Sequence, residues 1–301
     1  MPDSIDELVA LLQVDPIEAD VYRGGGIGRE GDRIFGGQIL GQALMAAARS
    51  MAGDDREVHS MHGYFLRTGN PALPIDYRVD RTRDGRSFSA RRVVAEQEGR
   101  ALFEMLLSFQ VSEPGFAHQR DESVEAPEPE SLPTYEECLA EVERENPHLI
   151  QDWMRRQGGI EQRPVDGFFA RHEKRDAFQR VWLRSARRLP DSPRIHQAVL
   201  AYACDMALID TAAFPHGLGD GAGAQVFSLD HAMWFHRPFR MDDWLLYALD
   251  SPTAGGARGF VRGRVFTRDG ELVVTVVQEG LLRPSRSLGS TSPRPRAGVS
   301  G

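Results

Sequence analysis

Three polar side chains each interrupt an apolar stretch of the chain. They are Asp205 in "AYACDMALID", Ser228 in "VFSLDHAMWF" and Gln278 in "VVTVVQEG". Because a polar group left unpaired in a buried segment costs about 1–3 kcal/mol, each needs a partner. A buried carboxylate has a raised pKa unless it gains hydrogen bonds, so Asp205 is a candidate general base. The structural alternatives are an aspartate paired with a backbone or arginine group and a serine that bonds across a strand ladder.

The segment around Ser228 predicts a strand, because a turn cluster precedes it and Val, Phe, Leu, Met and Trp fill it. Alternation along this strand would place Ser228 and Asp230 on one face and His231 on the other. This geometry argues against a serine nucleophile activated by His231, and the chain has no G-x-S-x-G turn to expose a serine. We interpret His231 and His236 as structural or substrate-contacting residues.

Two long helices, each followed by four strands, organise the rest of the chain. The alanine-rich and leucine-rich patterns predict helices over residues 35–51 and 192–214, the second containing Asp205. Hairpin signals such as Asp84-Gly85 separate the strands. The predicted strands are 58–66, 75–82, 87–97 and 101–111 in the first group, 225–235, 244–251, 259–267 and 272–281 in the second, and 164–172 and 178–186 before the second helix.

The chain divides into four predicted regions. Residues 1–112 form the N-terminal repeat, which begins with a short helix over 4–14, and residues 161–284 form the C-terminal repeat. Residues 113–160 are acidic and proline-rich and predict a solvated linker, with a surface helix capped near Thr134. Residues 285–301 are rich in Ser, Pro, Arg and Gly and predict a disordered tail.

The two repeats also correspond in sequence. "YFLR" at 64–67 answers "WFHR" at 234–237, and "SFSARRV" at 87–93 answers "GFVRGRV" at 259–265, with an offset near 170 positions. A constant offset across several elements is typical of a duplicated domain. A helix followed by an antiparallel meander predicts a sheet curled around that helix, and two copies can pair their edge strands into one long sheet. The predicted fold is therefore α+β, a double hotdog.

The repeat offers an internal control for the three polar residues. Sliding one copy over the other places Ala46 opposite Asp205, Val58 opposite Ser228 and Leu107 opposite Gln278. A duplicated core does not acquire polar groups without a reason. The second copy is therefore the predicted site of chemistry, and the first is its packing partner.

Composition excludes several classes of function. The net charge of −8 over 301 residues argues against a nucleic-acid surface, and no apolar run reaches the roughly 18 residues of a membrane span. The acidic N-terminus lacks the basic region of a signal peptide, so none is expected there, and two cysteines (Cys138 and Cys204) suit a reducing compartment. We therefore expect a cytoplasmic protein. With no metal or nucleotide motif present, no metal and no cofactor are expected.

Longer motifs resemble the acyl-CoA thioesterase II family over about residues 5–284. They include "FGGQILGQAL", "HGYFLRTGNP", "DHAMWFHRPF", "GARGFVRG" and "VVTVVQEGLLR". The resemblance implies a double hotdog enzyme of fatty acid metabolism that hydrolyses acyl-CoA to free acid and CoA, and that often assembles into homo-oligomers. It implies a catalytic set of Asp205, Ser228 and Gln278. Many bacterial members have Thr where this chain has Ser228.

The implied mechanism is direct attack by water, with Asp205 as base and with Ser228 and Gln278 holding both the water and Asp205 in place. Backbone N–H groups at Gly36-Gly37 are candidate donors to the carbonyl oxygen. Arg67, Arg91, Arg237, Arg258 and Arg262 are candidates for the CoA phosphates. The alternatives are a hotdog enoyl-CoA hydratase, for which "TGNPALP" supplies only the Asn-Pro of the expected loop, and a non-catalytic acyl-CoA-binding protein.

Overall fold

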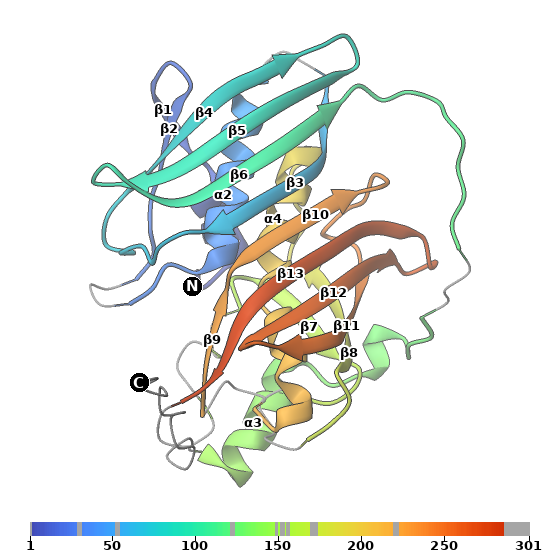
Figure 1. Ribbon diagram of the computed structural model, residues 1–301. Coiled ribbons are helices and arrows are strands. Elements are labelled where there is room, and N and C mark those ends of the chain that lie inside the picture. Colours follow the sequence, from blue (N-terminus) through green and yellow to red (C-terminus); the bar gives the residue numbers. More distant parts are fainter. Residues whose placement is uncertain are drawn as a thin grey trace, which may run out of the picture.

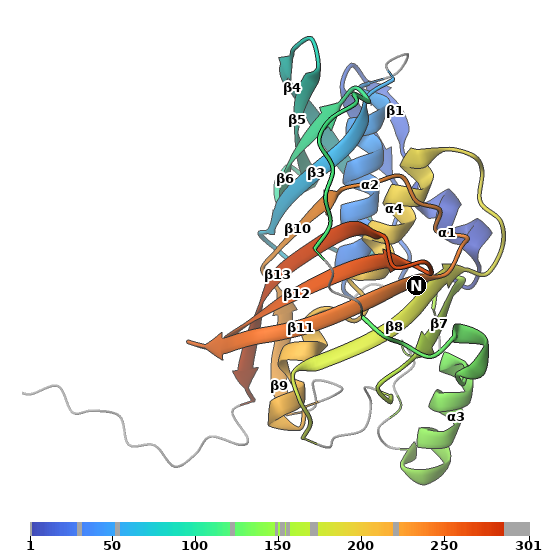
Figure 2. The same ribbon diagram turned by 90° about the vertical axis from the view of Figure 1, so that its right-hand side faces the viewer.

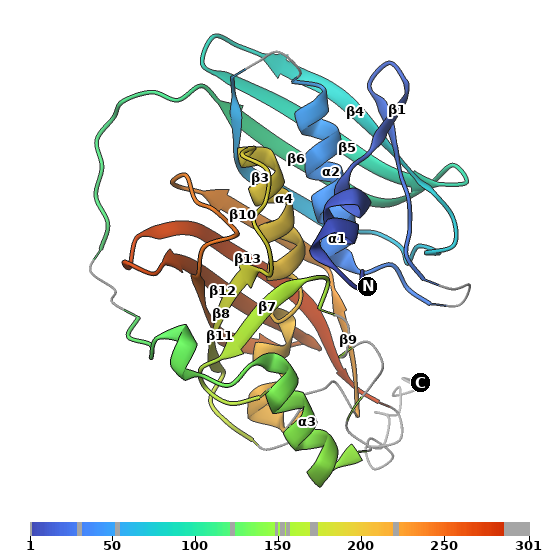
Figure 3. The same ribbon diagram turned by 180° about the vertical axis from the view of Figure 1, so that it is seen from behind.

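A single curved antiparallel sheet and two central helices make up the core of the protein (Figure 1). The computed structural model describes residues 2–28, 32–51, 55–120, 124–147, 150, 154, 157–168, 174–218 and 223–285, so the predicted disordered tail lies outside the described residues from 286 onward. The two central helices, α2 (Gly36–Arg49) and α4 (Pro193–Cys204), pack against each other on one face of the sheet, seen from behind in Figure 3.

The described strands form one 13-stranded sheet whose two halves correspond to the two repeats. Strands β4–β5–β6 and β11–β12–β13 form meanders, but the strand before each meander, β3 or β10, pairs with its last strand, β6 or β13, so the predicted four-strand meander is wrong. The halves join where β3 lies antiparallel to β10, with Gly63 opposite His231. The predicted pairing of edge strands is therefore confirmed. The strands are β1 (Asp15–Glu18), β2 (Val21–Gly24), β3 (Glu57–Phe65), β4 (Ile75–Asp84), β5 (Phe88–Gln97), β6 (Arg100–Gln110), β7 (Ile160–Pro164), β8 (Phe178–Ser185), β9 (Ala224–Ser228), β10 (Asp230–Phe235), β11 (Leu245–Gly255), β12 (Arg258–Thr267) and β13 (Leu272–Pro284).

Small residues let α2 and α4 approach closely and run antiparallel. A side-chain carbon added at Gly41 would lie 3.1 Å from the Ala198 carbonyl oxygen, and one at Gly37 would lie 2.5 Å from that of Tyr202. A third helix, α1 (Ile5–Leu12), is capped by Ser4 and packs on both; Figure 2 shows the three helices on the same side of the sheet. The N-terminus of α2 therefore meets the C-terminus of α4.

Helix α4 ends earlier than the sequence pattern predicts. Helix α4 ends at Cys204, and the chain continues through turns and two 3₁₀ segments, Ile209–Ala212 and Phe214–His216. One reason is that Gln179 of β8 donates to the Ala207 carbonyl, an acceptor that a continuous helix would use. By length and composition alone, Pro193–His216 passes as a membrane-spanning helix, but 67% of its apolar window is buried inside the protein. Its apolar character is that of a core helix.

The predicted strand over 225–235 is interrupted by a bulge. Ser228 pairs with Gly280 and Ala232 pairs with Val277. The segment from β9 to β10 therefore advances by four residues where β13 advances by three, which leaves one extra residue in the bulge. The extra residue reverses the alternation of side chains beyond it. The predicted strand over 164–172 is also wrong, because β7 ends at Pro164; residues 169–173 lie outside the described residues. The hairpin β1–β2 was not predicted.

The linker packs on the C-terminal half instead of being wholly solvated. Its helix α3 (Tyr135–Glu145) has the predicted cap, with Thr134 and Glu137 forming a capping box, and it buries one apolar face. Earlier in the linker, Val124 and Ala126 pack on a cluster around Trp182 and Trp244 on the sheet. Figure 1 shows the extended segment after β6 running around the outside of the sheet toward α3.

Candidate active site

Asp205 lies where the end of α4 meets the start of α2. It is the C-cap residue of α4, and its side chain is only 4% exposed. Phe35, the N-cap of α2, offers no side-chain acceptor, and the backbone N–H of Gly37 hydrogen-bonds the Asp205 carboxylate. A side-chain carbon at Gly36 would lie 2.7 Å from Asp205 Oδ2. Gly36 therefore makes room for a carboxylate at a helix N-terminus, where negative charge is stabilised.

The structure brings all three predicted site residues together from three elements. Gln278 on β13 is fully buried, and its Nε2 donates to Asp205 Oδ1 at 2.9 Å. The hydroxyl of Ser228, the last residue of β9, also hydrogen-bonds the Asp205 carboxylate. The carboxylate thus has a hydroxyl, an amide and a backbone N–H around it, and it is the centre of the cluster.

The environment of Asp205 raises its pKa to about 7, mainly because burial disfavours the charged form. Hydrogen bonds from Gln278, Gly37 and Ser228 act in the opposite direction and lower the pKa. A carboxylate with a pKa near neutrality can accept a proton from water during a reaction and release it afterwards. The predicted raised pKa of this aspartate is therefore found, with its cause.

His231 faces the site, contrary to the prediction from strand alternation. The bulge between Ser228 and Ala232 turns it inward, where it is fully buried. Its Nδ1 lies 3.3 Å from Gln278 Nε2 and 3.7 Å from Asp205 Oδ1. Burial lowers the pKa of His231 to about 3, so the imidazole is neutral. No signal in the sequence marks the bulge, since neither glycine nor proline lies within it.

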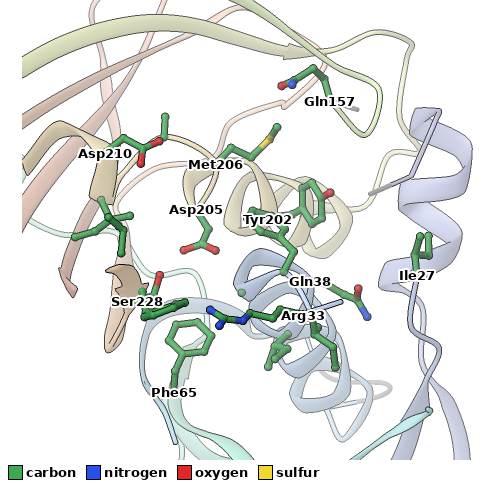
Figure 4. A pocket seen from close by; sticks show the side chains of 18 of the residues that line it. Ile27, Arg33, Gln38, Phe65, Gln157, Tyr202, Asp205, Met206, Asp210 and Ser228 are labelled. Atoms are coloured by element: carbon green, nitrogen blue, oxygen red, sulfur yellow. The ribbon is translucent and has the colours of Figure 1, made fainter. Parts of the chain in front are cut away.

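A cavity of about 850 Å³ opens beside Asp205 and Ser228. Figure 4 shows Phe65 on one side of Asp205 and Met206 and Tyr202 on the other. The cavity wall does not include Gln278 or His231, so these two reach its contents only through Asp205. A mostly apolar cavity with one buried carboxylate in its wall suits a ligand with a long apolar part and one reactive group.

Three arginines line this cavity. Of the five predicted for phosphate binding, only Arg67 is among them. The sequence did not single out the other two: Arg180 is paired with Asp166, and the Arg33 guanidinium lies 4.3 Å from the centre of the Phe227 ring. The other four predicted arginines are held elsewhere by carboxylates: Arg91 by Asp84, Arg237 by Glu271, Arg258 by Glu279 and Arg262 by Asp250. Arg91 is also buried, which excludes it from binding a ligand at the surface.

The matching region of the first repeat is filled by packing. Val58 and Leu107 are buried and apolar, as predicted. The helix comparison needs a correction, because Asp205 follows the end of α4 whereas Ala46 lies inside α2, whose C-cap is Ser50. Arg91 fills this end and donates to the Ser50 hydroxyl at 2.9 Å. Among the described residues, no group of three His, Cys, Asp or Glu side chains could hold a metal ion.

Comparison with known proteins identifies the family. Residues 25–110 match the family model of the acyl-CoA thioesterase N-terminal domain, and residues 162–281 match that of acyl-CoA thioesterase. Human acyl-coenzyme A thioesterase 8 is 38% identical over 284 residues, which cover 92% of this chain and 88% of the human protein. Acyl-CoA thioesterase 2 from Haemophilus influenzae is 36% identical over 291 residues, covering 94% and 99%.

Solved structures agree with these relatives. An acyl-CoA thioesterase II from Mycobacterium marinum is 40% identical, with a TM-score of 0.76 over 94% of this chain and 100% of that one. A hot dog fold protein from Alicyclobacillus acidocaldarius, 16% identical with a TM-score of 0.73, shares the fold alone. The predicted α+β double hotdog is confirmed. The chain therefore belongs to the acyl-CoA thioesterase family.

Proposed function

We propose that this chain hydrolyses fatty acyl-CoA thioesters to the free acid and CoA, by direct attack of a water molecule that Asp205 activates. The observation that carries this proposal is the buried Asp205 carboxylate, with a pKa of about 7, in the wall of a largely apolar cavity. The relatives named as acyl-CoA thioesterases support the substrate class. A role in fatty acid metabolism and a cytoplasmic location belong to the same proposal.

In this mechanism the water oxygen bonds to the thioester carbonyl carbon while Asp205 accepts a proton from that water. The tetrahedral intermediate then expels the CoA sulfur, and the proton on Asp205 passes to the departing thiolate. Ser228, which lines the cavity, hydrogen-bonds both the water and the carboxylate. Gln278, which is buried behind Asp205, holds the carboxylate in position. A positioned base of this kind contributes about 10²–10⁴-fold to the rate.

The N-terminus of α2 supplies the donors for the oxygen that becomes negative in the intermediate. The backbone N–H of Gly37 donates to Asp205, and Gly36 is the neighbouring residue in the first turn of α2, where N–H groups have no partner within the helix. Backbone N–H groups that are fixed before the reaction stabilise developing negative charge without reorganisation. The same helix end therefore serves the carboxylate and the substrate oxygen.

The charges along the cavity give the substrate a direction. Arg33 and Arg67 line the cavity, with Arg33 on the Phe65 side of Asp205 in Figure 4, and they suit the phosphates of CoA. The acyl chain then extends past Met206 and Tyr202 toward Gln157, the side of the cavity that Figure 4 shows opposite Phe65. A series of acyl-CoA substrates of increasing chain length measures how much of this part of the cavity the chain fills.

Release of free CoA thiol tests the proposal. Wild-type protein is expected to release thiol from acyl-CoA, and Asp205→Asn, Ser228→Ala and Gln278→Ala are each expected to reduce kcat while remaining folded. A folded Asp205→Asn protein with wild-type turnover would show that Asp205 is not the base. Loss of an enoyl chromophore without thiol release would indicate a hydratase, and tight acyl-CoA binding without turnover would indicate a binding protein.

Assembly into homo-oligomers, as dimers or tetramers of double hotdogs, is part of the same proposal. Tyr64 and Leu106 are 63% and 53% exposed on the neighbouring strands β3 and β6, which provides apolar surface for such a contact. Light scattering during size-exclusion chromatography measures the mass in solution. A monomer at micromolar concentration would contradict the predicted assembly and would leave the proposed chemistry intact.

A further inference from the structure

The side-chain amide of Gln278 is held from one end only. Its Nε2 lies 2.9 Å from Asp205 Oδ1 and 3.3 Å from His231 Nδ1, so its two N–H groups have two neighbours. Its Oε1 is buried and has no hydrogen-bond partner among the described residues. Because the two ends of an amide have nearly the same size and shape, the contacts at Nε2 alone decide which end faces Asp205.

The contact with Asp205 does not fix the amide under all conditions. An ionised carboxylate accepts a hydrogen bond, so it favours the NH₂ end of Gln278. A protonated carboxyl group is itself a donor, so it favours the oxygen end and a turned amide. Because the pKa of Asp205 is about 7, both forms are present near neutral pH. A second contact is needed to keep the amide in one orientation.

His231 provides a contact that does not change with pH. The imidazole is fully buried and neutral, since burial lowers its pKa to about 3. A neutral imidazole has one N–H and one bare nitrogen. Its Nε2 is buried and has no hydrogen-bond partner among the described residues, so the contact with Gln278 decides which nitrogen carries the proton. When the proton is on Nε2, the bare Nδ1 accepts a hydrogen bond from the Gln278 NH₂ group and repels its carbonyl oxygen.

We propose that His231 is a positioning residue for hydrolysis: its bare Nδ1 accepts one N–H of Gln278 and so keeps the other N–H on the Asp205 carboxylate. The inference deepens the proposed function and rests on it. His231 does not line the cavity and touches no reacting atom, so it acts through Gln278 and Asp205. Its effect is to favour the ionised form of Asp205, which is the form that accepts a proton from water.

The pH dependence of the reaction can report this effect, because the other titratable groups around Asp205 do not change charge near neutral pH. Tyr202 and Cys204 lie beside it on α4, and Tyr247 reaches it from β11. Burial raises the pKa of all three well above neutrality. The acid limb of the pH–rate profile therefore reports Asp205.

Two substitutions separate positioning from packing. His231→Leu keeps the bulk of the side chain and removes the acceptor, so kcat is expected to fall about tenfold to a hundredfold, the scale of a small misplacement at an active site. KM is expected to change less than about twofold, and the acid limb is expected to move to higher pH. In His231→Asn the side-chain oxygen is bonded to Cγ, as Nδ1 is in histidine, so an acceptor is kept. This variant is expected to have a kcat and an acid limb close to those of wild type.

His236 is the matched control, because it belongs to the same motif but lies on the outer face, where its Nε2 lies 2.8 Å from Thr275 Oγ1. His236→Leu and His236→Asn are expected to keep wild-type kcat and pH dependence. The proposal is overturned by a folded His231→Leu protein with wild-type kcat and an unshifted limb. It is also overturned when His231→Asn is as impaired as His231→Leu.

A measurement on the native protein covers the case in which His231→Leu does not fold. Nuclear magnetic resonance of ¹⁵N-labelled histidine is expected to place the His231 proton on Nε2 and to show no titration between about pH 5 and 9. A proton on Nδ1 overturns the acceptor role. Absence of thioester hydrolysis by the wild-type protein would overturn the proposed function, whereas an active wild type with an unaffected His231→Leu variant overturns only the role of His231.

Discussion

Replacing Asp205 by asparagine is expected to stabilise the fold while it removes activity. In the folded protein the pKa of this carboxyl is raised from 3.8 to about 7, mainly by burial. Between these two values the unfolded chain carries the charge and the folded chain carries the proton. The unfolded state therefore binds fewer protons, and stability falls as the pH rises from about 4 through 7. Above pH 7 the full cost of the buried charge is present.

The size of this effect follows from the pKa shift. A shift of about three units corresponds to about 4 kcal/mol. Asparagine can still accept from Gln278, but its NH₂ group faces the N–H of Gly37, which costs about 1 kcal/mol. We therefore expect Asp205→Asn to be about 3 kcal/mol more stable than wild type at pH 8.5, or roughly 6 °C in Tm at about 2 °C per kcal/mol. At pH 4.5 we expect nearly equal stability.

Urea unfolding of both proteins at the two pH values measures the difference. Asp242→Asn is the matched control with the opposite sign, because Arg240 lowers the pKa of Asp242 to about 2. The stability from Asp242 is present above its unfolded pKa and is lost as the pH falls through about 2, so this variant is expected to be less stable at pH 8.5. An Asp205→Asn protein that is destabilised at pH 8.5, or equally stabilised at both pH values, would refute the reasoning.

Three further substitutions test the surroundings of the site. Gly37→Ala places a carbon 2.5 Å from the Tyr202 carbonyl oxygen. It is expected to lower the free energy of unfolding by about 1–3 kcal/mol, measured by thermal unfolding, and to lower kcat at least about tenfold. The control Gly25→Ala, whose added carbon meets nothing within 4 Å, is expected to change neither. Arg67→Ala is expected to raise KM for acyl-CoA, and the increase is expected to be larger at low salt than at high salt. Arg262→Ala is the control. Equal KM values for the two variants would exclude Arg67 from CoA binding. Ser228→Thr keeps the hydroxyl and is expected to stay within about threefold of wild-type kcat, whereas Ser228→Val is expected to lose most activity; similar rates for the two would remove the hydroxyl from the mechanism.

Much of the fold could be predicted because each local pattern agreed with the whole. The small residues of α2 fit a helix that another helix approaches closely, and the paired strand patterns of the two repeats fit one continuous sheet. The convergence of Asp205, Ser228 and Gln278 was also predictable, because each polar group in a buried segment needs a partner.

The remaining features depend on contacts that are distant in sequence. The bulge that turns His231 inward is defined by the register with β13, and the early end of α4 depends partly on the Gln179 side chain from β8. Arg33 was missed because only the folded chain places it over Phe227 at the cavity. No pattern within a single segment contains these relations.

Isotope labelling in a single turnover tests most directly whether water attacks the thioester itself. With enzyme in excess over acyl-CoA in ¹⁸O-water, direct attack is expected to place one ¹⁸O atom in the fatty acid formed in the first turnover and none in the side chain of Asp205. Mass spectrometry of the acid and of the peptide that contains Asp205 measures both. An unlabelled acid together with ¹⁸O in Asp205 would show that the carboxylate attacks the substrate as a nucleophile, and would contradict water activation by Asp205.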